Sequence, residues 1–194
     1  RENIVNELQF IKKINVGKVL DIGCGPGWFL SFINSKWEKI GIEPSYKAYI
    51  QSKKIFKTYN DNFENVKLKK NSFNLIIMHH VIEHTVKPEI IIRNIYDLLK
   101  KNGYLIISTP DFDSGCARRV KNKYRLLNDK THISLFTNDS MHRFLRDHKF
   151  KIKKVDYPFF ETRYFNNKNL FRLKNTKNIS PPFYGNFMTF YAQK

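Results

Sequence analysis

The 194-residue sequence has only two cysteines, Cys24 and Cys116, and they form no CxxC motif. This scarcity argues against a disulfide framework and makes a reducing compartment the default. No run of about 18 apolar residues occurs, which argues against a membrane-spanning helix. The first residues also lack the charged and then apolar layout of a signal peptide. We therefore expect a cytoplasmic protein with no membrane span.

Acidic residues are also scarce, because 17 Asp and Glu stand against 35 Lys and Arg, for a formal net charge of +18. Such a balance suggests nucleic acid or an anionic membrane as a partner. The excess is mostly lysine spread along the chain, however, and asparagine and isoleucine are also plentiful, as a genome rich in A and T would produce. We favour the interpretation that the lysines form an ordinary solvated surface.

Segments with strand character alternate with segments of helical periodicity. Strands are expected at 18–23, 38–43, 73–78, 104–110, 151–157 and 187–194, with a short strand within 55–71. Helices are expected at 3–14, 28–35, 45–54, 87–102 and 137–150, with Asn3, Ser45 and Thr137 as N-caps. The alternation predicts an α/β fold with a mostly parallel sheet and helices on both faces. In such sheets, ligands bind at the carboxyl ends of the strands.

The stretch KVLDIGCGPGWFL joins a strand to a helix through a glycine-rich turn. Glycine permits positive φ and close backbone approach, and a helix N-terminus offers free N–H groups, so the turn is typical of a nucleotide site. Glu43 lies 20 residues after Gly23, where a carboxylate can accept hydrogen bonds from ribose hydroxyls. Trp28 replaces the last glycine of the dinucleotide fingerprint, and no P-loop lysine is present. Asp21, just before the turn, would repel a pyrophosphate and could instead help to hold a cationic ligand.

These residues resemble class I S-adenosylmethionine-dependent methyltransferases. VLDIGCGPGWFL is similar to the first motif of that family, GIEPS to the second, and SFNLIIMHHVIEHTVKPEIIIRNIYDLLKKNGYLIISTP to the fourth strand, the helix after it and the fifth strand. The resemblance covers about residues 17–157, with the motifs in the family's order. It implies a Rossmann-like seven-stranded sheet of order 3-2-1-4-5-7-6 with the last strand antiparallel. It also implies S-adenosyl-L-methionine as the cofactor and S-adenosyl-L-homocysteine as the product.

The resemblance further implies which residues bind the cofactor. The glycine turn would line its methionine and ribose portion, Glu43 would bind the ribose hydroxyls, and Pro44 would pack near the adenine. The segment NDNF would contact the adenine, and His79 would contact the methionine amino-acid portion. The full predicted set is Asp21, Gly23, Cys24, Gly25, Gly27, Glu43, Pro44, Asp61, Asn62, Phe63 and His79.

Histidines gather in HHVIEH, and another occurs in DKTHISLFT. Histidine is the commonest base near neutral pH, so His80 and His132 are the candidate catalytic residues. For His132, a role as a cap or loop-packing residue is an equal alternative. Some relatives carry E-x-x-E-H at this point and bind a divalent metal, which makes His80, Glu83, His84 and His132 candidate ligands. We favour the metal-free interpretation, because Glu83 and His84 also support the local turn in relatives without metal.

Two long segments fall outside the minimal fold, at about 110–130 and 158–186. Both start at carboxyl ends of strands, on the cofactor side, and both mix aromatic with basic residues. Loops of this length in compact domains are usually functional or disordered. We expect one domain over residues 1–194 in which these insertions form a cap over an acceptor pocket suited to an anionic group, although a self-packing loop is equally consistent.

The sequence therefore predicts a transferase that moves a methyl group from S-adenosylmethionine to a small molecule. O-methylation of a sugar, a glycan precursor or a quinone-like metabolite is the leading expectation. The net charge slightly favours an alternative, an RNA or DNA methyltransferase, but no RNA-binding module and no N-P-P-Y-type motif is seen. The other alternative is a non-catalytic protein of the same fold that binds a cofactor or a partner. The sequence leaves the oligomeric state open.

Overall fold

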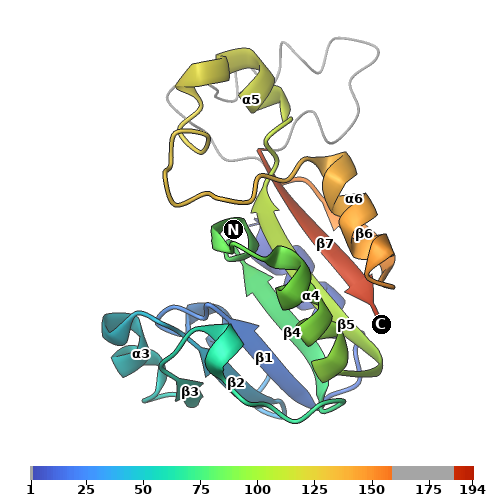
Figure 1. Ribbon diagram of the computed structural model, residues 1–194. Helices are drawn as coiled ribbons and strands as arrows, with labels where there is room; N and C mark the ends of the chain where they lie inside the picture. Colours follow the sequence, from blue (N-terminus) through green and yellow to red (C-terminus); the bar gives the residue numbers. More distant parts are fainter. Residues whose placement is uncertain (1, 159–185) are drawn as a thin grey trace.

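The computed structural model describes residues 2–158 and 186–194 (Figure 1). Seven strands form one sheet: β1 (Lys18–Ile22), β2 (Glu38–Ile42), β3 (Lys57–Tyr59), β4 (Phe73–His79), β5 (Leu99–Pro110), β6 (Lys151–Asp156) and β7 (Phe187–Gln193). Their spatial order is β3-β2-β1-β4-β5-β7-β6, and β7 pairs antiparallel with both of its neighbours while the pairs from β3 to β5 are parallel. The predicted α/β class, strand order and strand directions are confirmed.

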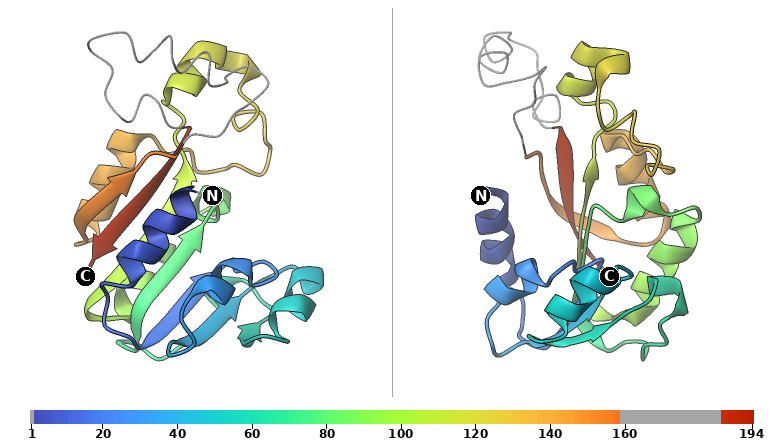
Figure 2. Two further views of the ribbon diagram at one scale, coloured as in Figure 1. Left: turned by 180° about the vertical axis from the view of Figure 1, so that it is seen from behind. Right: turned by 90° about the vertical axis from the view of Figure 1, so that its left-hand side faces the viewer.

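Helices cover both faces of the sheet. They are α1 (Glu2–Ile11), α2 (Trp28–Phe32), α3 (Tyr46–Ser52), α4 (Pro88–Leu98), α5 (Gly115–Val120) and α6 (Asn138–Asp147), with 3-10 turns η1 (Phe63–Asn65), η2 (Ile82–His84) and η3 (Lys121–Lys123). Figure 2 shows α1 and α4 on opposite sides of the strands. No helix among residues 2–158 and 186–194 is long and apolar enough to cross a membrane.

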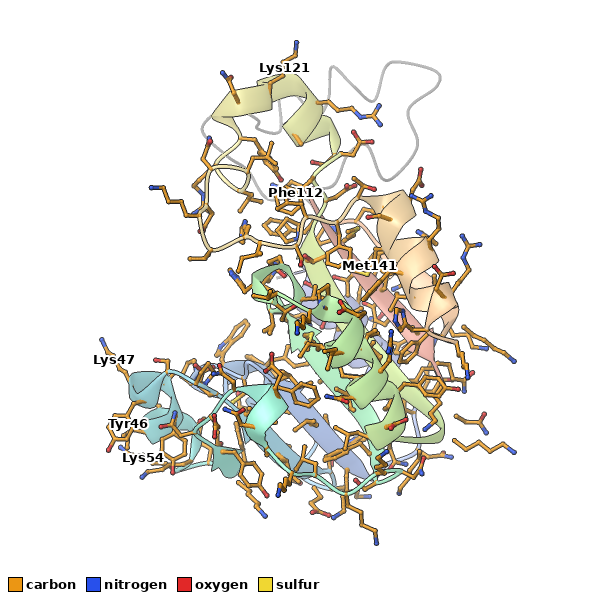
Figure 3. All side chains as sticks on the ribbon, viewed as in Figure 1. Tyr46, Lys47, Lys54, Phe112, Lys121 and Met141 are labelled. Atoms are coloured by element: carbon orange, nitrogen blue, oxygen red, sulfur yellow. The ribbon has the colours of Figure 1, made fainter. Side chains whose placement is uncertain are left out.

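The core divides into two layers because side chains alternate across each strand. On β1, Leu20 and Ile22 face the layer that contains α4 and α6, whereas Val19 faces the layer that contains α1 and α2. Met141 of α6 is fully buried in the first layer, and Figure 3 shows it between its helix and the sheet. The strands are thus covered on both faces, which leaves their carboxyl ends as the place for a site.

Several local predictions are confirmed. Thr137 caps α6 in a reciprocal capping box with Ser140, and Pro88 begins α4. Ser45 occupies the N-cap position of α3, although its side chain makes no capping hydrogen bond. The short strand expected within 55–71 is β3.

Other boundaries differ from the expectations. Asn3 lies inside α1 and does not cap it, and α2 ends at Phe32, three residues early. The helix expected to reach residue 102 ends at Leu98, and β5 begins at once because Leu99 pairs with Phe73 of β4. Pairing along the sheet thus overrides the helical pattern of the local sequence. The short helix α5, within the first insertion, was not anticipated.

Candidate functional site

Three glycines form the turn between β1 and α2, and all have positive φ: 73° at Gly23, 55° at Gly25 and 89° at Gly27. A Cβ at position 23 would lie 2.4 Å from Val81 Cγ2, and one at position 27 would lie 2.3 Å from Phe56 Cζ. A Cβ at position 25 would meet nothing within 4 Å. Gly23 and Gly27 are therefore required by packing as well as by φ, whereas Gly25 leaves open space beside the backbone.

Glu43, directly after β2, holds this turn in place. Its side chain is buried; Oε2 accepts a hydrogen bond from Gly25 N at 2.8 Å and Oε1 accepts one from Ser45 N at 2.8 Å. Each carboxylate oxygen keeps further acceptor capacity. Asn60, which the sequence analysis missed, donates from Nδ2 to the carbonyls of Glu43 and Pro44 at 2.9 and 3.0 Å. Its position directly after β3, at the carboxyl end of a strand, is the sequence feature that could have identified it.

A cavity of about 650 Å³ opens where β1, β2 and β4 end. This volume is within the range of small-molecule sites. Its lining includes these residues of the predicted site: Gly23, Glu43, Pro44, Asn62, Phe63, His79, His80 and His84. It also includes residues that the sequence analysis did not single out: Val81, Thr85, Val86, Lys87 and Ile90. The other predicted residues do not line the cavity: Asp21, Cys24, Gly25, Gly27, Asp61, Glu83 and His132.

Cys24 is buried beneath the turn and fills a gap in it. A Cβ on Gly41 would lie 2.6 Å from the Cys24 sulfur, so the two residues are in close contact. Burial, and next the charge of Asp21, raise the pKa of the thiol to about 12. The thiol therefore stays protonated at neutral pH and serves packing, and only the backbone of Cys24 remains available to a ligand.

A group of buried charges lies beneath the same edge. His79, at the end of β4, has Nε2 at 2.8 Å from Oε2 of Glu7 on α1. Asp21 of β1 is buried, and burial is the main reason that its pKa is raised to about 7, against the opposing charge of His79. Burial lowers the pKa of His79, but contact with Glu7 and the charge of Asp21 outweigh it, so the net shift is upward. The neighbouring Glu7 and Asp21 thus favour the protonated form of the imidazole.

His80 follows β4 in the left-handed region, with φ of 53°. This conformation is rare for a residue other than glycine and often marks a functional site. The ring of His80 has Nδ1 at 3.4 Å from Glu83 Oε1 and Nε2 at 3.4 Å from Ser108 Oγ. It also contacts the edge of Phe187, with ring centroids 4.9 Å apart. His80 is thus oriented at the mouth of the cavity, with its side chain 44% exposed.

Glu83, His84 and His132 form a second cluster next to His80. One donor atom from each lies within 4.8 Å of the other two. The Nδ1 atoms of both histidines contact backbone carbonyls, at 2.9 Å from Thr131 O and 2.6 Å from Leu126 O. In the neutral tautomer in which Nδ1 donates to the carbonyl, each Nε2 is the acceptor of its ring. Glu83 is fully buried; Thr109 Oγ1 donates to its Oε2 at 3.0 Å, whereas its Oε1 accepts no hydrogen bond from the described residues.

The segment that carries His132 is fixed to this cluster by its backbone. Ile133 N and Ser134 N both donate to Glu83 O, at 2.8 and 3.0 Å. Phe112, labelled in Figure 3 above the end of β5, lies with its ring 5.9 Å from that of His132. The structure thus brings His80, Glu83, His84 and His132 to one side of the cavity. The second insertion, at 158–186, lies almost wholly outside the described residues.

A family model described as "Methyltransferase domain" matches residues 2–155. The chain is 22% identical over 144 residues to malonyl-[acyl-carrier protein] O-methyltransferase of Legionella pneumophila, covering 70% of this chain and 50% of that protein. It is 28% identical over 158 residues to tRNA U34 carboxymethyltransferase of Ruthia magnifica, covering 75% and 49%. The chain spans about half the length of the curated relatives it matches.

The solved structures agree in fold. A SAM-dependent methyltransferase of Archaeoglobus fulgidus superposes with a TM-score of 0.73 at 18% identity, covering 100% of this chain and 93% of that chain. At this identity, the likeness concerns the fold alone.

Proposed function

The chain belongs to the methyltransferase-domain family, whose model matches residues 2–155, and on this premise we propose that it transfers a methyl group from S-adenosylmethionine to a small-molecule acceptor. The observation that carries the proposal is the turn at residues 23–27 held by Glu43 beside the 650 Å³ cavity. A turn with open space at Gly25, next to a buried carboxylate with acceptor capacity left over, suits a nucleoside ribose.

Adenine would lie beyond the ribose, between Pro44 and the segment of Asn62 and Phe63, which line the same cavity. Asp61 lies outside this lining, and its Oδ1 accepts from Asn62 N at 2.7 Å, so we assign it to shaping that segment. The methionyl end would lie at His79, because β4 adjoins β1 in the sheet.

S-adenosylmethionine supplies a methyl group on a sulfonium, which is already an activated methyl donor. The protein's main task is therefore to align the acceptor with the methyl carbon. We assign His80 the role of general base: its imidazole takes the proton of an acceptor hydroxyl as the oxygen gains the methyl group. The left-handed backbone and the contacts with Glu83 and Ser108 orient the ring for this step. The products are a methyl ether and S-adenosylhomocysteine, and the proton then passes from His80 to solvent. His132 would act on His80 indirectly, through the cluster that it forms with Glu83 and His84.

The acceptor is proposed to be a sugar, a glycan precursor or a quinone-like metabolite. The cavity is partly apolar where Val86 and Ile90 line it, and we assign this part to the acceptor; Lys87 offers a cation for an anionic group.

RNA methylation is a second candidate, supported by the net charge of +18 and by the relative that acts on tRNA. Tight RNA binding that weakens steeply with salt would favour RNA. A protein that binds S-adenosylhomocysteine and turns over no acceptor would be the non-catalytic alternative.

A divalent cation is a further candidate component. Glu83, His84 and His132 offer one carboxylate and two imidazoles, and the histidines' Nδ1 contacts to carbonyls are the kind that orient metal ligands. A cation there would supply charge to lower the pKa of a nearby acceptor hydroxyl. A bound cation would appear in metal analysis of untagged protein as about one equivalent per chain, lost in His132→Ala and retained in His80→Ala. Metal-free protein with full activity would exclude this component.

Two measurements test the proposal as a whole. Mass spectrometry after incubation of the protein and the donor with a metabolite extract should detect a product heavier by one methylene unit. His80→Ala should lower its formation by roughly 100-fold or more.

Glu43→Ala should weaken S-adenosylhomocysteine binding by about 10-fold, because a charge-assisted hydrogen bond contributes about 1.5–3 kcal/mol. Glu38→Ala, an exposed glutamate of the same strand paired with Lys18, is the matched control. Unchanged affinity in Glu43→Ala would refute the ribose assignment.

A further inference from the structure

The pair of Glu7 and His79 is a feature that the reaction itself does not require. Glu7 stands in the middle of α1, far in sequence from the motifs, and its side chain is 3% exposed. Burial of a carboxylate is costly unless it is paired, and the pair here is with the one imidazole that lies at the end of β4 and lines the cavity. A helix that only covered the sheet would place an apolar residue at this position.

The ring of His79 has close neighbours on two sides. Nε2 faces Glu7, and the edge of Phe29 from α2 lies against the ring with centroids 4.7 Å apart. The structure records no hydrogen bond to Nδ1 within the described residues, and the side chain keeps 22% exposure. A protonated imidazole donates from both nitrogens, so Nδ1–H has no acceptor among the described residues and is available to a ligand.

The order of the strands indicates which part of a bound cofactor would lie next to His79. Glu43 follows β2, the glycine turn follows β1, and His79 ends β4, and these three strands are neighbours in that order. A cofactor with its ribose at Glu43 therefore has its other end, which carries an ammonium and a carboxylate, at β4. The ammonium suits the acids of this region, and the carboxylate requires a donor with positive charge.

We propose that Glu7 is a positioning residue of the cofactor site: it orients His79 as an imidazolium that binds the carboxylate of the methionyl end, and it thereby couples docking of α1 to cofactor binding. The proposal rests on the proposed function. The surrounding charges agree with it. Asp21 keeps its proton up to about pH 7, so it opposes the incoming carboxylate little below that pH. Phe10 anchors the same helix on Tyr104 and Tyr191, with ring centroids 5.3 and 4.6 Å apart.

The test compares S-adenosylmethionine with its decarboxylated form, which differs only by the carboxylate, in calorimetric titrations at pH 6.5. Glu7→Gln should weaken S-adenosylmethionine binding by 5-fold or more and decarboxylated S-adenosylmethionine binding by less than 2-fold. Glu38→Gln should change neither. His79→Asn should reproduce the same difference, which keeps the test valid if Glu7→Gln unfolds.

The remaining outcomes distinguish failure of this inference from failure of the proposed function. Equal losses for both ligands in both variants would show a purely structural pair and overturn the inference while leaving the proposed function intact. Unchanged binding in both variants would overturn it as well. If the wild-type protein bound neither ligand, the proposed function would fail and the inference would fail with it.

Discussion

The two halves of the sheet's carboxyl edge are built in different ways. At the ends of β1 and β2, the turns at residues 23–27 and 43–45 are short and lead at once into helices. At the end of β5, residues 111–137 intervene before α6, and they are held by distant partners: Tyr124 OH donates to Asn186 O at 3.2 Å, and Ile133 N donates to Glu83 O. The first half is built from short turns that Glu43 joins to each other, and the second from a long segment held by long-range contacts. The half proposed to bind the cofactor is therefore the one that a sequence can specify locally.

The largest expected effect separates two glycines within the first half. Gly27→Ala should destabilise the fold by about 2–5 kcal/mol, because a left-handed residue with a side chain costs roughly 1–2 kcal/mol and overpacking against Phe56 adds about 1–3 kcal/mol. Gly25→Ala should cost only about 1–2 kcal/mol, since its Cβ would meet open space. Urea unfolding gives both values.

Ligand binding should rank the same two variants in the opposite order. Gly25→Ala fills the space that we assign to the cofactor and should weaken S-adenosylhomocysteine binding by 10-fold or more. Gly27→Ala, measured where it is still folded, should bind closer to wild type. Wild-type affinity in Gly25→Ala would mean that the open space beside the turn is not the cofactor's.

The second prediction concerns pH and the buried charges under the first half. The pKa of Asp21 rises from an ordinary value of 3.8 to about 7, chiefly through burial, so between pH 4 and 7 the folded protein binds more protons than the unfolded chain. Stability must therefore fall as pH rises through that window. The pKa of His79 is raised above 6.5, so its contribution is also present below pH 6.5 and lost above its folded pKa. Both effects have the same sign.

The wild-type protein should accordingly be more stable at pH 5 than at pH 8, by about 2 kcal/mol. Asp21→Asn should remove most of this difference by raising stability at pH 8. Asp97→Asn, which alters an exposed ion pair with Lys70, should leave the difference unchanged. Urea unfolding at the two pH values decides it, and a wild-type protein that is more stable at pH 8 would contradict the assignment of buried charge.

The same contrast explains which features of the fold and the site could be predicted from the sequence and which could not. The glycine turn and the position of Glu43 follow from patterns that span a few residues, and the strand order follows from the resemblance to a known family. Glu7, Asn60 and Ser108 were missed because their roles depend on contacts with residues remote in sequence, such as Glu7 with His79. The end of α4 was misplaced for a similar reason, because pairing of Leu99 with Phe73 is a property of the sheet. The roles of the individual site residues stay predictions.

The smallest expected effect tests whether the two halves are independent. Tyr124 is buried, and its hydroxyl links the segment after α5 to the carbonyl of Asn186, just before β7. Tyr124→Phe removes that hydrogen bond, but Asp111 N still donates to the same carbonyl at 3.2 Å, so no buried acceptor is stranded. We therefore expect a loss of about 1 kcal/mol, with S-adenosylhomocysteine affinity within 2-fold of wild type. Tyr46→Phe, at a position 67% exposed on α3 and labelled in Figure 3, should lose nothing. A 10-fold loss of affinity in Tyr124→Phe would show instead that the long segment shapes the cofactor half, and the separation drawn between the two halves would have to be abandoned.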